Sequence, residues 1–184
     1  GIENPTKEEM RRFDKKRQGK KVSNEDWVSS SDSDSRITRM KDGRTHLAYK
    51  AENVIDMEPD QIMAASIRQA EESDTQTLAD SVGEAQTHLN EAELEKHIEE
   101  VVADKGYHST DQLERCQWLG LRTYVPEPKS PHNRKLKKLD KKKRQALLNN
   151  RKRTKRRKSK ELQRKRSARV ERSFAPLCDT GGAR

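Results

Sequence analysis

Two carboxylates in the sequence have surroundings that suit metal-assisted chemistry. Asp104 directly follows the apolar run 101–103, and Glu171 follows Val170 near the end of a long basic stretch. A carboxylate at the end of a strand and another on a helix are parts of a typical Mg²⁺ site, because Mg²⁺ prefers oxygen ligands and usually takes one or two protein carboxylates. Two such ions about 4 Å apart catalyse phosphoryl transfer.

Each carboxylate also has a simpler interpretation. A carboxylate after a strand commonly caps a helix or lies in a solvated loop. A glutamate in a basic helix commonly forms an ion pair with a residue one turn away. The local pattern therefore leaves metal binding and these structural roles open for both residues.

Residues 98–125 predict a strand, a helix and a second strand around Asp104. The first strand ends at Ala103, and Gly120 can end the helix because glycine readily adopts the left-handed conformation. Two strands joined in this way are normally parallel, with a right-handed connection. Functional groups collect just beyond the carboxyl ends of such strands, which is where Asp104 is placed.

Two pairs of residues have the spacing of a capping box, in which a hydroxyl side chain and a Glu or Gln three residues later bond each other's backbone. Ser109 with Gln112 predicts the start of the helix after Asp104. Thr6 with Glu9 predicts one short helix within an otherwise polar linker, residues 1–44.

Residues 45–67 predict a β-hairpin ahead of this unit. Apolar residues from Leu47 to Ile55 keep to one parity, the sequence MEPD supplies the turn, and residues 62–67 form the return strand.

Residues 74–100 predict two helical stretches. Asp74 can cap the first stretch, whose apolar residues form a single stripe facing a core. That stripe consists of Leu78, Val82, Ala85 and Leu89. The second stretch, residues 91–100, leads directly to the strand before Asp104.

The composition predicts a small packed centre with polar flanks. Of the 184 residues, 29% are hydrophobic, 4% aromatic and 39% charged, which is too little apolar material to offset the ordering entropy of the whole chain. There is no apolar run long enough to span a membrane and no signal-peptide pattern, so a cytosolic protein is expected. Cys116 and Cys178 lack metal-site spacing and are interpreted as reduced thiols.

The positive charge is concentrated in residues 129–172. This tract has 22 Lys and Arg against three acids, a net charge of +19, so the rest of the +10 chain carries −9. Such clustering is typical of a polyanion partner, because neutralised phosphates release counterions. A solvated tract without a specific partner is the alternative.

The leucines of this tract are too sparse to predict a core, so we expect exposed helices joined by polar turns. Without interleaved aromatic residues, the tract is expected to hold the phosphates of such a partner without reading sequence. The residues expected to contact these phosphates are Lys135, Lys137, Lys138, Lys142, Arg144, Arg151, Arg153, Arg156, Arg157 and Arg166.

Three segments, in this order, carry a family resemblance: MKDGRTHLAYKAENVIDME, VVADKGYHS and RSARVERSFAPLCDTGGAR. Together they resemble the catalytic region of the DDE-class insertion-sequence transposases, whose fold is ribonuclease H-like. The resemblance implies an α/β fold with an incomplete mixed sheet, flanking helices and a basic helical or disordered insert. The implied organisation is a linker at 1–44, a partial catalytic core at 45–128, the insert at 129–160, and a glutamate-bearing helix with a truncated C-terminus at 161–184.

The resemblance also implies roles for the two carboxylates. The second catalytic aspartate of the family stands in a D-x-G-Y context, which Asp104 matches with Gly106 and Tyr107. The catalytic glutamate stands in an R-x(4)-E context, which Arg166 and Glu171 match. Both acids are therefore implied to be catalytic and to bind Mg²⁺ or Mn²⁺.

Departures from the family pattern predict a fragment, truncated at both ends. The first aspartate of the family lies on a strand upstream of the hairpin, and no stretch of this sequence matches it. Asp56 is the best local substitute, while Asp32 and Asp34 lie in a serine-rich loop without a scaffold. Pro176 predicts that the helix bearing the glutamate kinks or ends near Ala175.

The function implied by the resemblance is DNA transposition by a bacterial insertion-sequence transposase. The enzyme would cut and join DNA strands, with double-stranded DNA of the element ends and of the target as partner, as a homodimer in the bacterial nucleoid region. The present chain is expected to bind DNA and to be inactive by itself. A non-catalytic basic protein that binds DNA or RNA, and a pseudogene product without function, are the alternatives.

Overall fold

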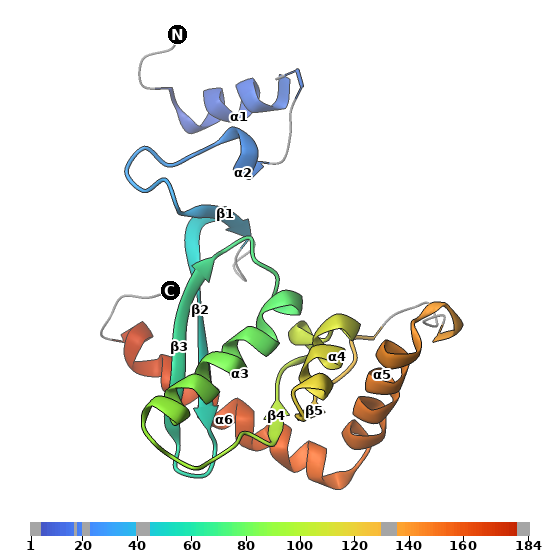
Figure 1. The fold of residues 1–184 in the computed structure, drawn as a ribbon. Coiled ribbons are helices and arrows are strands. Elements are labelled where there is room, and N and C mark those ends of the chain that lie inside the picture. The colour runs from blue at the N-terminus through green and yellow to red at the C-terminus, as the bar shows by residue number, and fades with distance from the viewer. Residues whose placement is uncertain (1–4, 17, 20–22, 40–44, 130–135, 180–184) are drawn as a thin grey trace. The chain divides into compact units, whose positions relative to one another are not determined.

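The fold is known from a computed structural model, which describes residues 5–16, 18–19, 23–39, 45–129 and 136–179 (Figure 1). The chain forms two compact units. The first comprises residues 1–50 and 69–71, and the second comprises residues 51–68 and 72–184. Asp104 and Glu171 both belong to the second unit.

The first unit begins with α1 (Lys7–Lys16), which starts at the predicted capping box. The Thr6 amide donates to Glu9 Oε2 at 2.8 Å, and the Glu9 amide donates to Thr6 Oγ1 at 3.3 Å. The short helix α2 (Ser23–Asp26) follows. The capping-box prediction is therefore confirmed for α1.

A strand, β1 (Arg36–Arg39), also forms in the segment for which the sequence predicts only a linker and one helix. It pairs antiparallel with the beginning of β2 (Thr45–Asp56), from Arg36 opposite Ala48 to Arg39 opposite Thr45. The strand is stabilised further by Asn24 of α2, whose Oδ1 accepts from the Ile37 amide at 2.6 Å.

The predicted hairpin is confirmed. β2 and β3 (Gln61–Gln69) are joined by a turn at residues 57–60, and the three-stranded sheet has the order β1-β2-β3. The apolar parity of β2 does not face the core, however. Leu47 and Tyr49 are 51% and 43% exposed, whereas Glu52, on the opposite face, is 6% exposed.

The helix α3 (Asp74–Glu91) buries the predicted stripe of Leu78, Val82, Ala85 and Leu89. Its N-cap is Ser73, whose side chain accepts from the Thr75 amide, so the prediction of Asp74 as the cap is wrong by one residue.

The second predicted helical stretch is wrong, because residues 94–99 have no regular structure. Glu93 has a left-handed φ of 54°, which ends the helical path. The Gln86 side chain then bonds two backbone groups of this segment. It donates to Lys96 O at 3.0 Å and accepts from the Ile98 amide at 2.9 Å.

The strand, helix and strand predicted around Asp104 are confirmed. β4 (Glu100–Val102) leads through a short 3-10 helix, η1 (Lys105–Tyr107), to α4 (Thr110–Trp118) and then β5 (Arg122–Tyr124). β4 and β5 pair in parallel, with Glu100 opposite Arg122. Gly120 follows α4 with a φ of 77°, as its role in ending the helix requires.

The second predicted capping box is wrong. Ser109 is the N-cap of α4, but its side chain makes no capping hydrogen bond. Gln112 is instead buried against α3, where its Oε1 accepts from the Ala79 amide at 2.9 Å and its Nε2 donates to Gln76 O at 2.8 Å. The Gln112 side chain, which the local pattern assigns to a cap, therefore bonds the backbone of α3 instead.

The basic tract forms the short helix η2 (Leu136–Lys138), α5 (Lys141–Thr154) and α6 (Arg157–Asp179). The prediction that its leucines cannot contribute to a core is wrong for α5, which packs on α4 and β5 (Figure 1). Ala146 and Leu147 are 1% and 0% exposed and belong to the main hydrophobic cluster. Two adjacent apolar residues are enough because α4 and β5 complete the cluster around them.

The sequence predicts that α6 kinks or ends near Ala175, and the second alternative is wrong, since the helix continues through Pro176 to Asp179. Within the described part of the chain, no helix is both long and apolar enough to cross a membrane.

Candidate active site and nucleic-acid interface

Asp104 lies where the sequence predicts, just beyond β4, and its carboxylate is exposed. Its Oδ1 accepts from the Lys105 amide at 2.7 Å, so it caps η1. The Tyr107 amide donates to Asp104 O at 3.1 Å and closes the turn. The structure therefore confirms the capping role that the pattern left open, while the second carboxylate oxygen makes no hydrogen bond with a described residue.

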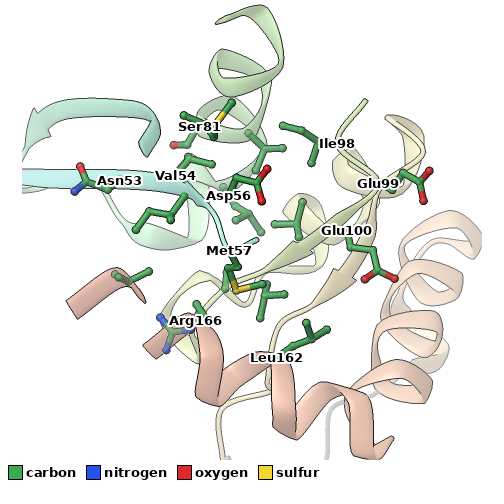
Figure 2. Close-up of a pocket in the computed structure, with 18 of the residues that line it drawn as sticks. Asn53, Val54, Asp56, Met57, Ser81, Ile98, Glu99, Glu100, Leu162 and Arg166 are labelled. Carbon is green, nitrogen blue, oxygen red and sulfur yellow. The ribbon is translucent and has the colours of Figure 1, made fainter. Parts of the chain in front are cut away.

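Asp104 lines a pocket of about 410 Å³. Two continuous segments form its walls. The first is residues 52–58, which belong to β2 and the turn after it, and the second is residues 96–104, which include β4. Apolar side chains of α3 close one side, and Leu162, Arg166 and Val170 of α6 form another (Figure 2). Arg166, the arginine of the family motif, thus shares this pocket with Asp104.

Glu171 is on the exposed surface of α6, where its Oε1 accepts from Ser167 Oγ at 2.9 Å. Val170 lines the pocket of Asp104, but Glu171 does not. Successive residues of an α-helix are rotated by about 100° about its axis. Glu171 therefore lies on a different face from Val170, on the outward stripe that includes the exposed Lys160 and Arg164. The structure therefore does not bring the two predicted catalytic acids into one pocket.

The hairpin holds α6 through side-chain contacts on both sides of Glu171. Lys165 pairs with Glu58 at 2.6 Å. Arg169 and Arg172 both pair with Asp60 in the hairpin turn. On the adjacent face of α6, Asn53 Nδ2 donates to Ser173 Oγ at 3.1 Å. These contacts fix the rotation of α6 and hence the direction of Glu171.

Sequence reasoning missed Glu52, a buried carboxylate of β2 that also lines the pocket. Its Oε1 accepts from Thr77 Oγ1 at 2.8 Å, and its Oε2 accepts from Ser81 Oγ at 2.7 Å and from Arg68 Nε at 2.9 Å. The apolar residues of β2 have the opposite parity, so the pattern directs Glu52 to solvent. Nothing local in the sequence signals its burial.

Glu52 and Tyr107, a residue of the turn after Asp104, line the same pocket. Burial alone would raise the pKa of Glu52, but hydrogen bonds from Ser81, Tyr107, Thr77 and Arg68 together hold it below its ordinary value. Burial raises the pKa of the Tyr107 hydroxyl, and the hydrogen bond to Glu52 raises it further. Glu52 is therefore ionised and the Tyr107 hydroxyl keeps its proton at neutral pH.

The predicted DNA-binding residues fall into two groups. Four have exposed side chains without an ion pair to any described residue: Lys138, Lys142, Arg144 and Arg156.

The other described members have partners within the protein. Arg151 forms two hydrogen bonds with Glu127, at 2.7 and 2.8 Å. Arg153 donates to Thr123 O at 2.8 Å, and burial lowers the pKa of its guanidinium. Arg157 pairs with Glu161 at 2.8 Å, and Arg166 Nε donates to Gln163 at 3.2 Å. Lys135 and the side chain of Lys137 lie outside the described residues.

The described carboxylates do not make a complete metal site. No group of three or more His, Cys, Asp or Glu side chains suited to a metal occurs among the residues whose placement is described. Asp56 lines the pocket with Asp104, but its Oδ1 accepts from the Glu58 amide at 3.0 Å and caps the hairpin turn. The donor chemistry suits Mg²⁺, but the arrangement does not fit it.

Comparison with known proteins supplies the family. No curated protein and no solved structure showed significant similarity to the chain. A family model described as "Transposase DDE domain" matches residues 10–184, a span that includes the whole second unit, with the Asp104 turn and α6, and the first unit from residue 10 onward. Such domains generally depend on a divalent metal and act on DNA. The mixed α/β architecture is compatible with this assignment, and the chain belongs to the DDE transposase domain family.

Proposed function

We propose that this chain provides part of the catalytic domain of a bacterial insertion-sequence transposase, with a ribonuclease H-like fold and double-stranded DNA as substrate. The observation that carries this proposal is the placement of Asp104, at the carboxyl end of a parallel strand and in one pocket with Arg166, in a chain that the transposase family matches over residues 10–184. Asp104 and Glu171 are the proposed catalytic acids, for DNA cleavage and strand transfer.

The pocket of Asp104 supports the proposal that the catalytic sheet is incomplete in this chain. β1 pairs with β2 only up to Ala48, so the edge of residues 49–56 on that side has no partner from β1. β4 pairs only with β5 among the described strands. The pocket is lined by residues of both strands, 52–58 and 96–104, and by apolar side chains of α3. A further strand inserted here would pair with both edges and bring an additional acid beside Asp104.

We therefore propose that further residues complete the active site. Mg²⁺ or Mn²⁺ is proposed to bind only in the completed site. The chain by itself is proposed to bind DNA without cutting it. A homodimer is the proposed form of the complete enzyme, with the bacterial nucleoid as its location.

A strand-transfer assay tests this function. The chain would be compared with a version extended by whatever its reading frame encodes ahead of Gly1, using a labelled DNA duplex of the element end and a plasmid target. Activity is expected in the extended protein and is expected to be lost in Asp104→Asn and in Glu171→Gln. Asp80→Asn, which changes a surface carboxylate paired with Arg115, is the matched control.

Full activity of both acid variants would overturn the catalytic assignment. Hydrogen exchange on the same proteins tests the inserted strand, because the amides of residues 52–56 and 100–102 should exchange more slowly in the extended form. Unchanged exchange in these two segments would refute the incomplete sheet.

A second candidate function is non-catalytic binding of DNA or RNA, and the unpaired cations of η2 and α5 favour it. The double variant Lys142→Gln with Arg144→Gln should reduce the slope of log affinity against log salt by about 0.9 for each lost phosphate contact. Arg115→Gln with Lys143→Gln removes the same charge from cations that are paired with Asp80 and Asp111. Salt-dependent binding together with full tolerance of Asp104→Asn in every assay would favour this alternative.

A further inference from the structure

The side-chain amide of Gln163 joins α6 to the strand that leads to Asp104. Its Nε2 donates to Ala103 O at 3.1 Å and to Tyr124 O at 2.7 Å, so one side chain bonds the carboxyl ends of both β4 and β5. Its Oε1 accepts from Arg166 Nε at 3.2 Å, about one turn further along the helix. Both ends of the amide therefore have partners, and all of these residues belong to the second unit.

The chemistry of the partners determines which way this amide points. A backbone carbonyl can only accept a hydrogen bond, and a guanidinium group can only donate one. The reversed amide would place the Gln163 oxygen against two carbonyls and its NH₂ group against Arg166, so neither contact could form. Ala103 and Tyr124 are also interior residues, 7% and 4% exposed. Loss of the amide would take a donor from two carbonyls in the interior, which is costly.

The bond to Ala103 O constrains the backbone immediately before Asp104. This oxygen belongs to the peptide group that joins the two residues, and that group is planar, so the bond also fixes the plane of the Asp104 amide. On the other side, the Lys105 amide donates to Asp104 Oδ1 at 2.7 Å, and the Tyr107 amide donates to Asp104 O at 3.1 Å. Gln163 therefore holds the backbone before Asp104, and the turn holds the backbone after it.

We propose that Gln163 is a positioning residue for Asp104 and is itself oriented by Arg166. This inference rests on the proposed catalytic role of Asp104. Asp104 and Arg166 both line the pocket, whereas Gln163 is not among the residues that line it. Gln163 therefore acts through the peptide group before Asp104. It also connects this peptide group to the helix that carries Glu171, through bonds to neutral carbonyls that salt does not screen as it screens ion pairs.

Three variants separate positioning from two simpler roles. Gln163→Met removes both ends of the amide and keeps a similar side-chain length. Gln163→Glu keeps an acceptor for Arg166 but opposes the two carbonyls, so it would be tolerated if only the Arg166 contact mattered. Lys158→Met removes the bonds of α6 to Glu100, at the other end of β4. It would act like Gln163→Met if Gln163 served only to dock α6 on the sheet.

Side-chain NMR of the wild-type chain tests the contact without any substitution. The NH₂ protons of Gln163 should exchange with solvent at least about tenfold more slowly than those of Gln145, because both of their acceptors lie in the interior. Gln145 is the matched reference, since it is exposed and donates to Asn149 of its own helix. Equal exchange rates for the two side chains would overturn the proposal.

Backbone hydrogen exchange then measures the Asp104 turn itself. The two amides that bond Asp104 should exchange about tenfold faster in Gln163→Met and in Gln163→Glu, as expected for the loss of a hydrogen bond to a buried group. They should keep the wild-type rate in Lys158→Met and in the control Gln145→Met. Wild-type rates in Gln163→Met, or equally fast exchange in Lys158→Met, would contradict positioning.

Strand transfer by the extended protein provides the functional measurement. Both Gln163 variants should lower kcat by about tenfold or more and leave KM for DNA unchanged, because Gln163 does not line the pocket. Lys158→Met and Gln145→Met should keep the wild-type kcat.

The outcomes distinguish this inference from the proposed function. Normal kcat in Gln163→Met, together with loss of activity in Asp104→Asn, would refute positioning and leave the proposed function standing. An inactive extended wild type whose Asp104 turn still loosens in Gln163→Met would refute the proposed function, while the hold of Gln163 on the turn would stand.

Discussion

The surroundings of Asp104 and Glu171 differ in the kind of interaction that holds them. β4, α4, β5 and α5 form a core in which Leu113, Val125 and Leu147 are at most 1% exposed. Asp104 extends from one end of this core. α6 contacts the hairpin mainly through ion pairs, with Arg172 and Lys165 reaching the acids of the turn. The first region is held by apolar packing, whereas the orientation of Glu171 depends on interactions that salt weakens.

The largest effect that distinguishes the two regions should come from Leu147→Ala. Leu147 is completely buried between α5 and its neighbours, so its truncation leaves a cavity and should lower the free energy of unfolding by about 2–5 kcal/mol. Leu148→Ala is the matched control, because Leu148 is 41% exposed and should cost less than about 1 kcal/mol. Urea unfolding of both variants measures this difference, and equal midpoints would show that α5 does not belong to the core.

A smaller effect is expected from Asn150→Ala. The Asn150 side chain donates to Val125 O at 2.8 Å and accepts from the Val125 amide at 3.1 Å, both in the interior. Its removal leaves two buried backbone groups without a partner and should cost about 2–3 kcal/mol. Asn149→Ala removes an amide bonded to Gln117 nearer the surface, and urea unfolding should show the smaller loss there. A larger loss in Asn149→Ala would contradict the assignment.

The ion-pair region should respond to Asp60→Asn. Asn tolerates the left-handed φ of 59° at this position, so the variant removes the charge and not the turn. Loss of the pairs with Arg169 and Arg172 should lower the free energy of unfolding by about 1 kcal/mol at low salt. The loss should shrink at about 1 M salt, where such pairs are screened. A loss independent of salt would show that α6, like α5, is held by packing.

The smallest effect concerns Glu100, which joins the two regions. Both of its oxygens accept from Lys158 of α6 at 2.7 Å, and Oε1 also accepts from Tyr124 at 3.1 Å. Burial opposes the charge of Glu100, but its hydrogen bonds with Lys158 and Tyr124 hold its pKa below the ordinary value.

Because the folded pKa of Glu100 is the lower one, its contribution to stability is present above the unfolded value and is lost as pH falls through the folded value. Glu100→Gln should therefore reduce stability at neutral pH and flatten the decline in acid. Thermal unfolding measured from neutral to acidic pH checks this expectation. An acid dependence identical to that of the wild type would contradict it.

Local patterns predicted the elements that depend on the types and spacing of residues near one another in the chain. The hairpin, the α3 stripe and the parallel unit around Asp104 follow from alternation, helical spacing and the left-handed Gly120. The prediction failed for residues 94–99, because the Gln86 side chain provides the bonds that a helix would have made. No local pattern signals a long-range side-chain partner of this kind.

The sequence also identified the carboxylates and the arginine of the family motif, but it did not determine which polar residues are buried. Glu52, Gln112 and Asn150 are all at most 6% exposed and all bond elements distant in the chain. The amino-acid sequence by itself determined the local elements, the charge of the basic tract and the motif around Asp104. Only the tertiary structure decided that α5 enters the core and that Glu52 is buried against Arg68, Thr77 and Ser81. Burial and hydrogen bonding depend on neighbours brought together by folding, which no short segment contains.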